Sequence, residues 1–238
     1  MARRALVTGS ARGIGRAILL KLAREGLDVA VHYRKSREDA ERTRREAEGL
    51  GVRAVLVAGD VASPEGAAEV VRRAARELGG LDVLVHNVGD YLYKPIEKTS
   101  FDEWRAIIAS NLDSAFYLTQ AALSYLREGD AAKRVVYLGY AGAGQMLAKP
   151  HIAPYFIAKT GLLLLAKAYA KRFAGEGITF NVVAPGVAEN SVSKPIDEIP
   201  MRRTASLSEV ARAVWFFVDE EAGYLTGQVV EVAGGWNL

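Results

Sequence analysis

Short apolar segments alternate with longer segments of helical pattern along the whole 238-residue chain. Parallel strands need crossover connections of helical length, so this alternation predicts a parallel sheet with helices on both faces. The predicted strands are 4–8, 28–33, 53–57, 81–86, 134–138, 178–183 and 228–232, and the predicted helices are 13–26, 36–50, 64–78, 101–127, 154–174 and 206–219. We therefore expect one α/β domain over residues 1–238, a doubly wound parallel sheet of about seven strands, without a linker or an internal repeat.

Composition excludes several classes of function. The chain is 50% hydrophobic and 25% charged, which is ordinary for a globular protein. It contains no cysteine, which rules out disulfides and thiolate chemistry, and its three histidines (His32, His86 and His151) are too scattered for a metal site. The net charge of +3 comes without a basic stripe interleaved with aromatic residues, so we expect no nucleic-acid partner.

The hydropathy pattern carries no sign of a membrane protein. The longest apolar run, 162–166, is far too short to cross a bilayer. The first residues lead straight into a predicted strand and lack the apolar core of a signal peptide. We therefore expect a cytoplasmic protein with no membrane partner.

A glycine-rich segment separates the first predicted strand from the first predicted helix. Glycines there allow positive φ angles and close approach of a pyrophosphate to the backbone, while the helix N-terminus favours negative charge. An ordinary strand-to-helix turn is the alternative, but the position at the first strand–helix junction favours dinucleotide binding. The candidate residues are Gly9, Ser10, Arg12, Gly13, Ile14 and Gly15, in the spacing G-x-x-x-G-x-G.

The end of the second predicted strand bears on which nicotinamide cofactor binds. An acidic residue there accepts a hydrogen bond from a ribose 2′-hydroxyl and repels a 2′-phosphate. Here the strand ends at Tyr33 and Arg34, and no acid occurs until Glu38. Arg34 could simply begin a charged helix, but together with Arg12 it favours NADP(H).

Two further strand ends carry candidate cofactor contacts. Asp60 and Val61 follow the third predicted strand, where an aspartate can reach an adenine amino group. Asn87, Val88 and Gly89 follow the fourth, and the glycine leaves room for a ligand. Each of these segments alone is also compatible with an ordinary loop.

Tyr155 and Lys159 form the sharpest pair of candidate catalytic residues. Residues four apart on a helix share one face, and a neighbouring ammonium lowers the pKa of a phenol toward working pH. Of the ten tyrosines, only Tyr155 has a lysine four residues later. A chance surface pair is the alternative, but the apolar run after Gly161 favours a sheltered site.

Taken together, these motifs resemble those of the short-chain dehydrogenase/reductase family over essentially the whole chain. Thr8–Gly15 resembles the family motif T-G-x-x-x-G-x-G, 86–89 stands in for N-N-A-G, and 155–159 matches Y-x-x-x-K. Asn111 matches a helix asparagine, and Pro185, Gly186 and Val187 match the segment beside the nicotinamide. The resemblance implies a Rossmann-like fold and a homo-oligomer, often a tetramer. It also implies that Tyr155 is a general acid, that Lys159 holds the nicotinamide ribose and that Asn111 binds a water molecule that relays protons.

The departures from the family pattern lie around the expected substrate. Tyr140 stands where the family has a catalytic serine, and no serine occurs between Ser124 and Ser191. Tyr140 either donates its hydroxyl to the substrate or packs elsewhere, which would leave the site weakened. The segment between Gly186 and Pro200 is shorter than is usual in relatives, Asn190 replaces a threonine, and 145–151 is a candidate gate.

The function that these patterns favour is an NADPH-dependent carbonyl reductase resembling the 3-oxoacyl-carrier-protein reductases. Its partner would be a small-molecule carbonyl compound or an acyl group linked to a carrier. Two alternatives stay open: a pterin reductase of the same family, and a catalytically weakened NADP-binding sensor or assembly protein.

Overall fold

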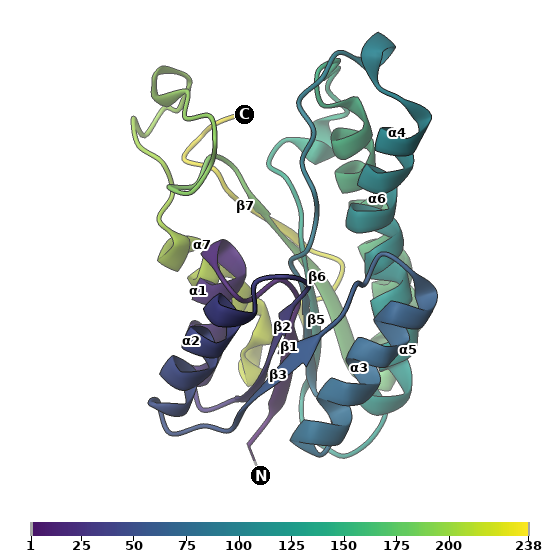
Figure 1. The fold of residues 1–238 in the computed structure, drawn as a ribbon, viewed down its shortest axis with the longest axis vertical. Helices are drawn as coiled ribbons and strands as arrows, with labels where there is room; N and C mark the ends of the chain where they lie inside the picture. Colours follow the sequence, from purple (N-terminus) through teal and green to yellow (C-terminus); the bar gives the residue numbers. More distant parts are fainter. Residues whose placement is uncertain (1, 238) are drawn as a thin grey trace.

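The computed structural model describes residues 2–237, and its centre is a seven-stranded parallel sheet in the order β3-β2-β1-β4-β5-β6-β7. Every strand pairs in parallel with its neighbours (Figure 1). The strands are β1 Arg4–Val7, β2 Asp28–Tyr33, β3 Ala54–Ala58, β4 Val83–His86, β5 Lys133–Leu138, β6 Ile178–Pro185 and β7 Val229–Val232. The predicted doubly wound sheet and its number of strands are confirmed.

Helices cover both faces of the sheet, as Figure 1 shows. One layer consists of α1 Gly13–Arg24, α2 Arg37–Glu48 and α7 Leu207–Val218. The other consists of α3 Pro64–Leu78, α5 Ser114–Leu126 and α6 Ala153–Phe173. The strand order reverses between β1 and β4, and in sheets of this kind ligands bind at the carboxyl ends of the strands beside such a reversal.

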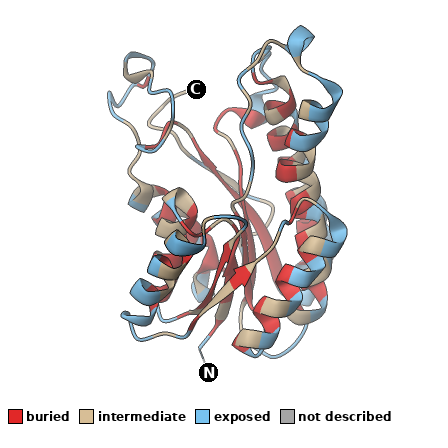
Figure 2. Cartoon of the chain, viewed as in Figure 1, coloured by how far each residue is buried: buried red, intermediate tan, exposed pale blue. Residues whose placement is uncertain are grey.

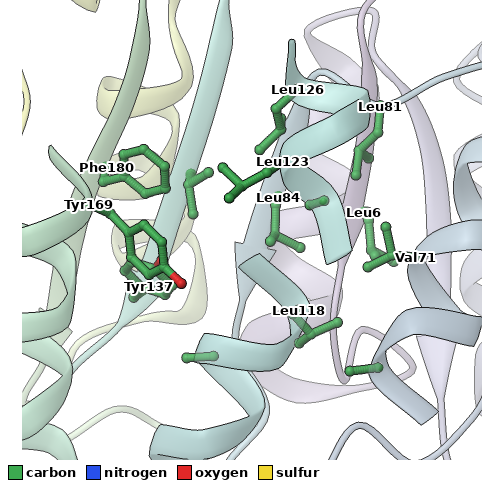
Figure 3. Packing of buried hydrophobic residues seen from close by; sticks show 14 of the residues in the cluster. Leu6, Val71, Leu81, Leu84, Leu118, Leu123, Leu126, Tyr137, Tyr169 and Phe180 are labelled. Atoms are coloured by element: carbon green, nitrogen blue, oxygen red, sulfur yellow. The ribbon is translucent and has the colours of Figure 1, made fainter. Parts of the chain in front are cut away.

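A separate hydrophobic core lies on each face of the sheet, because the strands are apolar on both sides (Figure 2). On one face, Leu6 and Leu84 of the sheet pack with Leu118 of α5, and Phe180 stacks on Tyr169 of α6 with ring centroids 5.2 Å apart (Figure 3). Tyr137 is fully buried there, and its hydroxyl shares a 2.8 Å hydrogen bond with Oγ1 of Thr119. These contacts hold α5 and α6, which carry candidate catalytic residues, against the sheet.

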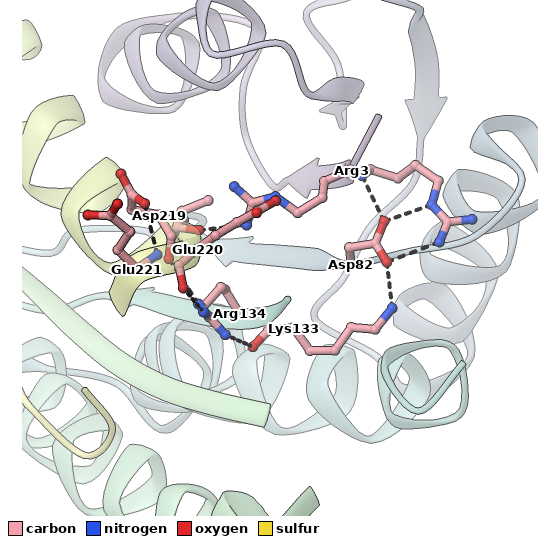
Figure 4. Close-up of polar contacts among 9 residues, drawn as sticks. Arg3, Asp82, Lys133, Arg134, Asp219, Glu220 and Glu221 are labelled. Carbon is pink, nitrogen blue, oxygen red and sulfur yellow. Dashed lines mark hydrogen bonds and ion pairs between the residues drawn. The ribbon is translucent and has the colours of Figure 1, made fainter. Parts of the chain in front are cut away.

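Buried charges gather at the amino ends of the strands, away from the clefts (Figure 4). Asp82 accepts hydrogen bonds from Nε of Arg4 at 2.7 Å and from Nζ of Lys133 at 2.5 Å. Arg3 donates to the carbonyl of Val218 at 2.7 Å, and Arg134 donates to the carbonyl of Glu220 at 3.0 Å. The two arginines thereby satisfy carbonyl groups at and beyond the C-terminal end of α7.

The expected continuous helix over 101–127 is wrong, because a π-helical turn interrupts it. The segment consists of α4 Phe101–Ile108, the π-helical turn Ala109–Asp113 and then α5. Asn111 lies in this turn, and its Nδ2 donates to the carbonyl of Ile107 at 3.0 Å and to the carbonyl of Asp90 at 2.9 Å. Apolar periodicity does not reveal such a turn, which widens the helix by a single residue and often occurs at functional sites.

Within residues 2–237, no helix combines the length and the apolar character that crossing a bilayer requires.

Candidate active site

Two adjoining clefts lie at the carboxyl ends of the strands. The first has a volume of about 420 Å³ and is lined by the glycine loop and by the segments that follow β3 and β4. The second has a volume of about 1000 Å³ and is lined by α6, the ends of β5 and β6 and the C-terminal segment. Ile14, Asn87, Gly89 and Asn190 line both clefts, so the two share a wall.

The glycine loop has the shape expected of a diphosphate cradle. Gly9 and Gly13 have φ angles of 63° and 59°, which favour glycine. A β-carbon on Gly15 would lie 2.4 Å from the carbonyl oxygen of Gly9, so only glycine fits there. The loop leads directly into the N-terminus of α1 and lines the first cleft, a setting that suits an anionic ligand.

His32 holds the glycine loop in place, a role that the sequence analysis missed. Its Nδ1 accepts a hydrogen bond from the backbone N–H of Gly9 at 3.0 Å, and its Nε2 lies 3.2 Å from the carbonyl of Gly59. Burial lowers the pKa of His32 to about 4, so the ring is neutral at physiological pH. The neutral ring can therefore accept from the loop on one nitrogen and donate to the β3 end on the other.

Ser10 and Tyr33, both candidate cofactor contacts, line neither cleft. The Ser10 hydroxyl is buried, donates to the carbonyl of Val7 at 2.7 Å and accepts from the backbone N–H of His32 at 3.0 Å. The Tyr33 carbonyl accepts from the backbone N–H of Gly59 at 3.1 Å. Ser10 thus joins the loop to β2, and Tyr33 joins β2 to the β3 end.

The outer part of the first cleft carries opposed charges. Arg12, Arg34 and Asp60 all line it, and Nη1 of Arg34 lies 3.4 Å from Oδ2 of Asp60. The other carboxylate oxygen of Asp60 accepts from the backbone N–H of Ala62 at 3.0 Å. Arg12 and Arg34 carry two positive charges against the one negative charge of Asp60. The net charge of these three side chains is therefore positive, which suits a phosphate.

The residues that follow β4 form the shared wall of the clefts. Nδ2 of Asn87 donates to the carbonyls of Thr8 and Gly9, at 3.0 and 3.3 Å, which ties this segment to the glycine loop. Val88, Gly89 and Val61 line the first cleft. At these three positions, the wall of the first cleft consists of backbone and small side chains.

Asn111 lies close behind the clefts and lines neither of them. It is fully buried, and its Oδ1 has no hydrogen-bond partner among the described residues. A buried carbonyl-type oxygen without a partner is a ready acceptor for one more donor.

Tyr155 and Lys159 both line the second cleft, one helical turn apart on α6. Nζ of Lys159 is buried, donates to the carbonyl of Leu138 at 2.7 Å and lies 5.6 Å from the centre of the Tyr155 ring. Burial lowers the pKa of Lys159 to about 8. Its ammonium therefore anchors α6 to the end of β5 rather than contacting the phenol oxygen.

The expected lowering of the Tyr155 pKa is wrong for this structure. Burial raises that pKa, and the neighbouring phenols of Tyr140 and Tyr91 raise it further. At the distance that Lys159 keeps, its charge does not offset these effects. Tyr155 is therefore a neutral phenol at physiological pH, the form that can donate a proton.

Tyr140 faces the same cleft as Tyr155. The centroids of the two rings are 5.6 Å apart and nearly perpendicular, and Tyr140 also packs against Phe156 and Trp236. Burial raises the pKa of Tyr140 to about 12, so it too carries its proton. The ring thus lines the cleft rather than packing away from it.

The remaining walls of the second cleft come from loops. Pro185, Gly186 and Val187 line it at the end of β6, and Lys149, Pro150 and His151 line it from the candidate gate. Trp236 closes the cleft from the C-terminal segment, and its ring lies 3.3 Å from the position of a β-carbon on Gly186. Sequence reasoning missed Trp236 because nothing near it in the chain marks it as part of the site.

No group of three histidine, aspartate or glutamate side chains in the described part of the chain could hold a metal ion.

Comparison with known proteins identifies the family to which the chain belongs. Residues 9–237 match a family model described as enoyl-(acyl carrier protein) reductase, one of the short-chain dehydrogenase/reductase models. The chain belongs to the short-chain dehydrogenase/reductase family of oxidoreductases.

Several proteins with known names or structures resemble the chain over 99% or more of its length. A 3-oxoacyl-[acyl-carrier-protein] reductase of Staphylococcus epidermidis is 32% identical over all of both chains. A short-chain dehydrogenase of Burkholderia cenocepacia in complex with NADP is 31% identical, with a TM-score of 0.93 over 99% of this chain and 98% of that one. A blue fluorescent protein from a metagenomic library in complex with NADPH is 28% identical, with a TM-score of 0.92 over 99% of this chain and 98% of that one.

Two residues at strand ends, which the sequence analysis expects to depart from the family pattern, have defined partners. Tyr140, expected at the place of the family serine, stands beside Tyr155. His86 is the first residue of the segment that resembles N-N-A-G, and its Nε2 lies 2.8 Å from Oγ of Ser114 at the start of α5. His86 thus links the end of β4 to the helix that follows the π-helical turn.

Proposed function

We propose that the protein is an NADPH-dependent reductase of a carbonyl group, with Tyr155 as the general acid. The observation that carries the proposal is the position of Tyr155, a neutral phenol one turn from Lys159, in a cleft that shares a wall with the glycine-loop cleft. A reductase needs a proton donor beside a hydride donor, and the adjoining clefts provide one place for each.

The residues present fit NADP(H). The glycine loop would receive the diphosphate, Arg12 and Arg34 the 2′-phosphate, and Asp60 and Val61 the adenine. Pro185, Gly186 and Val187 would lie beside the nicotinamide, and Lys159 would hold its ribose. When bound, this cofactor supplies a hydride to the carbonyl carbon. Structural relatives in complex with NADP and NADPH support this cofactor.

The chain's own residues would manage the proton. As the carbonyl carbon gains a hydride, its oxygen gains the proton of the Tyr155 hydroxyl, which gives an alcohol. The positive charge of Lys159 would favour the phenolate left behind. Asn111, whose Oδ1 is buried without a protein partner, would hold a water molecule for returning a proton. The Tyr140 hydroxyl would orient the substrate carbonyl in place of the family serine.

The first experiment is oxidation of NADPH by the purified protein with a 3-oxoacyl thioester, a diketone, a quinone and a dihydropterin. We expect turnover of at least one carbonyl compound. Tyr155→Phe should keep NADPH affinity and lose about 10²-fold or more in kcat. Unchanged turnover in this variant would contradict the assignment of Tyr155, and preference for the dihydropterin would point to a pterin reductase.

Tyr140→Ser separates an active enzyme from a cofactor-binding sensor. If Tyr140 orients the substrate, the wild type turns over and the serine variant changes KM or kcat modestly. A wild type that binds NADPH tightly but reduces nothing, beside an active serine variant, would instead favour the non-catalytic function.

We also propose that the protein assembles into a homo-oligomer. Phe116 of α5 and Ile157 and Leu164 of α6 are exposed apolar side chains on helices that cover the same face of the sheet. Light scattering coupled to size exclusion would measure the mass in solution. A monomer at micromolar concentration would contradict this part of the proposal.

A further inference from the structure

A group of aromatic side chains lines the second cleft around Tyr155. Five of them, from four segments of the chain, face the same space: Tyr91, Tyr93, Tyr140, Tyr155 and Trp236. The cleft of about 1000 Å³ also has aliphatic lining, but these rings offer their faces and edges as contacts for a substrate near the proposed proton donor.

The inner rings are arranged around the proposed proton donor. The rings of Tyr91 and Tyr140 both stand nearly perpendicular to Tyr155, with centroids at 5.1 and 5.6 Å and interplanar angles of 81° and 84°. Trp236 stands at 83° to Tyr140 with a centroid distance of 5.8 Å. A substrate whose carbonyl reaches Tyr155 would therefore lie against aromatic rings.

Exposed aromatic surface continues to the mouth of the cleft. Tyr91 and Tyr93 are 55% and 70% exposed, although both line the cleft. Tyr93 stacks on His151 of the neighbouring loop, with ring centroids 5.4 Å apart and an interplanar angle of 16°. Large apolar side chains left exposed in a cleft commonly mark a ligand site.

The charges near the mouth do not suit a large acidic carrier. Lys94, Arg202 and Arg203 form ion pairs with Glu103, Asp197 and Glu209, respectively. Lys149, which lines the cleft, has no ion pair among residues 2–237, and its Nζ lies 5.9 Å from the centre of the Trp236 ring. Lys194, between the lining residues Ser193 and Pro195, also has no ion pair among those residues, and the carboxylate of Glu198 lines the same cleft. Two cations beside one carboxylate provide little of the complementary field by which an acidic protein would be steered and held.

From these observations we infer that the cleft selects a flat, fused-ring aromatic ketone or quinone over an acyl chain attached to a carrier. The inference deepens the proposed function and rests on it for the chemistry. Aromatic rings gain stabilisation from edge-to-face and offset contacts that a saturated ring of the same size cannot make. The preference should therefore depend on the flatness of the substrate and on the rings that line the cleft.

Pairs of ligands that share a carbon skeleton and differ in aromaticity and flatness test the inference. Calorimetry would compare 2-naphthol with trans-2-decalol on the NADP⁺-loaded protein, and steady-state kinetics would compare 2-tetralone, 2-decalone and an acetoacetyl group on an acyl carrier protein. We expect the aromatic member of each pair to be favoured about tenfold or more, in Kd and in kcat/KM. The carrier-linked compound should be the poorest of the three ketones.

Variants then show whether the preference comes from the lining rings. Tyr91→Leu and Trp236→Leu should each reduce the preference for 2-naphthol several-fold, whereas Tyr224→Leu, which changes a fully exposed ring outside both clefts, should not. Equal affinity for the two alcohols, a preference unchanged in both cleft variants, or much faster turnover of the carrier-linked compound would overturn the inference. Selective binding of 2-naphthol without reduction of any ketone would uphold the aromatic site and contradict the proposed function.

Discussion

A β-carbon on Gly89 would lie 2.2 Å from Oδ1 of Asn111. Gly89 belongs to the wall between the two clefts, and Asn111 belongs to the π-helical turn behind it. The absence of a side chain at Gly89 thus allows the segment after β4 to rest on the amide of Asn111. The same contact joins the proposed cofactor cleft to the proposed proton path.

Gly89→Ala should therefore displace the side chain of Asn111 while leaving the residues of the first cleft in the chain. We expect a loss of kcat of tenfold or more with a smaller change in the Kd of NADPH, because the methyl group must push Asn111 from its bonds to Asp90 and Ile107. Steady-state kinetics and fluorescence titration of NADPH would measure the two quantities. Gly175→Ala is the matched control, since a β-carbon there meets no atom within 4 Å. Equal kinetics in the two variants would argue against a role for the contact.

Cofactor preference should depend on the two guanidinium groups of the first cleft. Changing Arg12 and Arg34 together to glutamine should weaken NADPH by about tenfold or more and leave NADH within about threefold, because only NADPH carries the 2′-phosphate. Titration of each coenzyme at two salt concentrations would show this difference and its screening. Equal losses for the two coenzymes would assign the arginines to another role.

Stability should fall in mild acid because two histidines are buried in the neutral form. Burial lowers the pKa of His32 to about 4, and burial together with the charge of Lys159 lowers that of His86 to about 3. Both pKa values lie below the unfolded value of about 6.5, so the unfolded chain binds more protons between pH 6.5 and 4 and stability declines as pH falls through that range. Each histidine should cost about 2 kcal/mol between pH 7 and 5.

Urea denaturation at pH 7, 6 and 5 would measure that decline. Carboxylates contribute little above pH 5, because they are ionised in both states there. In His32→Gln the fall between pH 7 and 5 should be about 2 kcal/mol smaller than in the wild type, whatever the variant costs at pH 7. An identical pH dependence in the two proteins would mean that His32 is not buried in the neutral form.

The buried ion pairs at the amino ends of the strands should matter more than exposed ones. Asp82→Ala leaves Arg4 and Lys133 without their carboxylate, and we expect a loss of about 3–5 kcal/mol in the free energy of unfolding. Glu69→Ala, which removes an exposed pair with Arg72, should cost far less, because water screens that pair. Chemical denaturation of both variants would test the contrast, and similar losses would contradict it.

The sequence predicted the elements whose signals are local. Apolar strands, the glycine loop at the first junction and the spacing of Tyr155 and Lys159 each depend on residues close together in the chain, and the structure brings the last two into one cleft. The contacts of His32 with Gly9 and of Trp236 with the end of β6 join distant segments. No local pattern marks such contacts, so they could not be predicted without the fold.

The direction of the Tyr155 pKa shift could not be predicted from the local sequence either. A helix places Lys159 one turn away, but the distance from its ammonium to the phenol depends on where that ammonium finds a hydrogen bond. Here it bonds to the carbonyl of Leu138, and burial of the phenol dominates. The spacing predicts that Tyr155 and Lys159 are neighbours, whereas the tertiary structure determines the protonation state of Tyr155.

The π-helical turn at Ala109–Asp113 makes the site sensitive to the number of residues as well as to their identity. A π-helical turn accommodates one residue more than a regular α-helical turn, so deleting one residue from it would let α4 and α5 join as one regular helix and would move the residues of the turn itself to new angular positions. Asn111 would then turn away from Asp90 and Gly89 even though every side chain of the site was still present in the chain. In designed variants of this segment, keeping the number of residues should therefore matter more than keeping their identities.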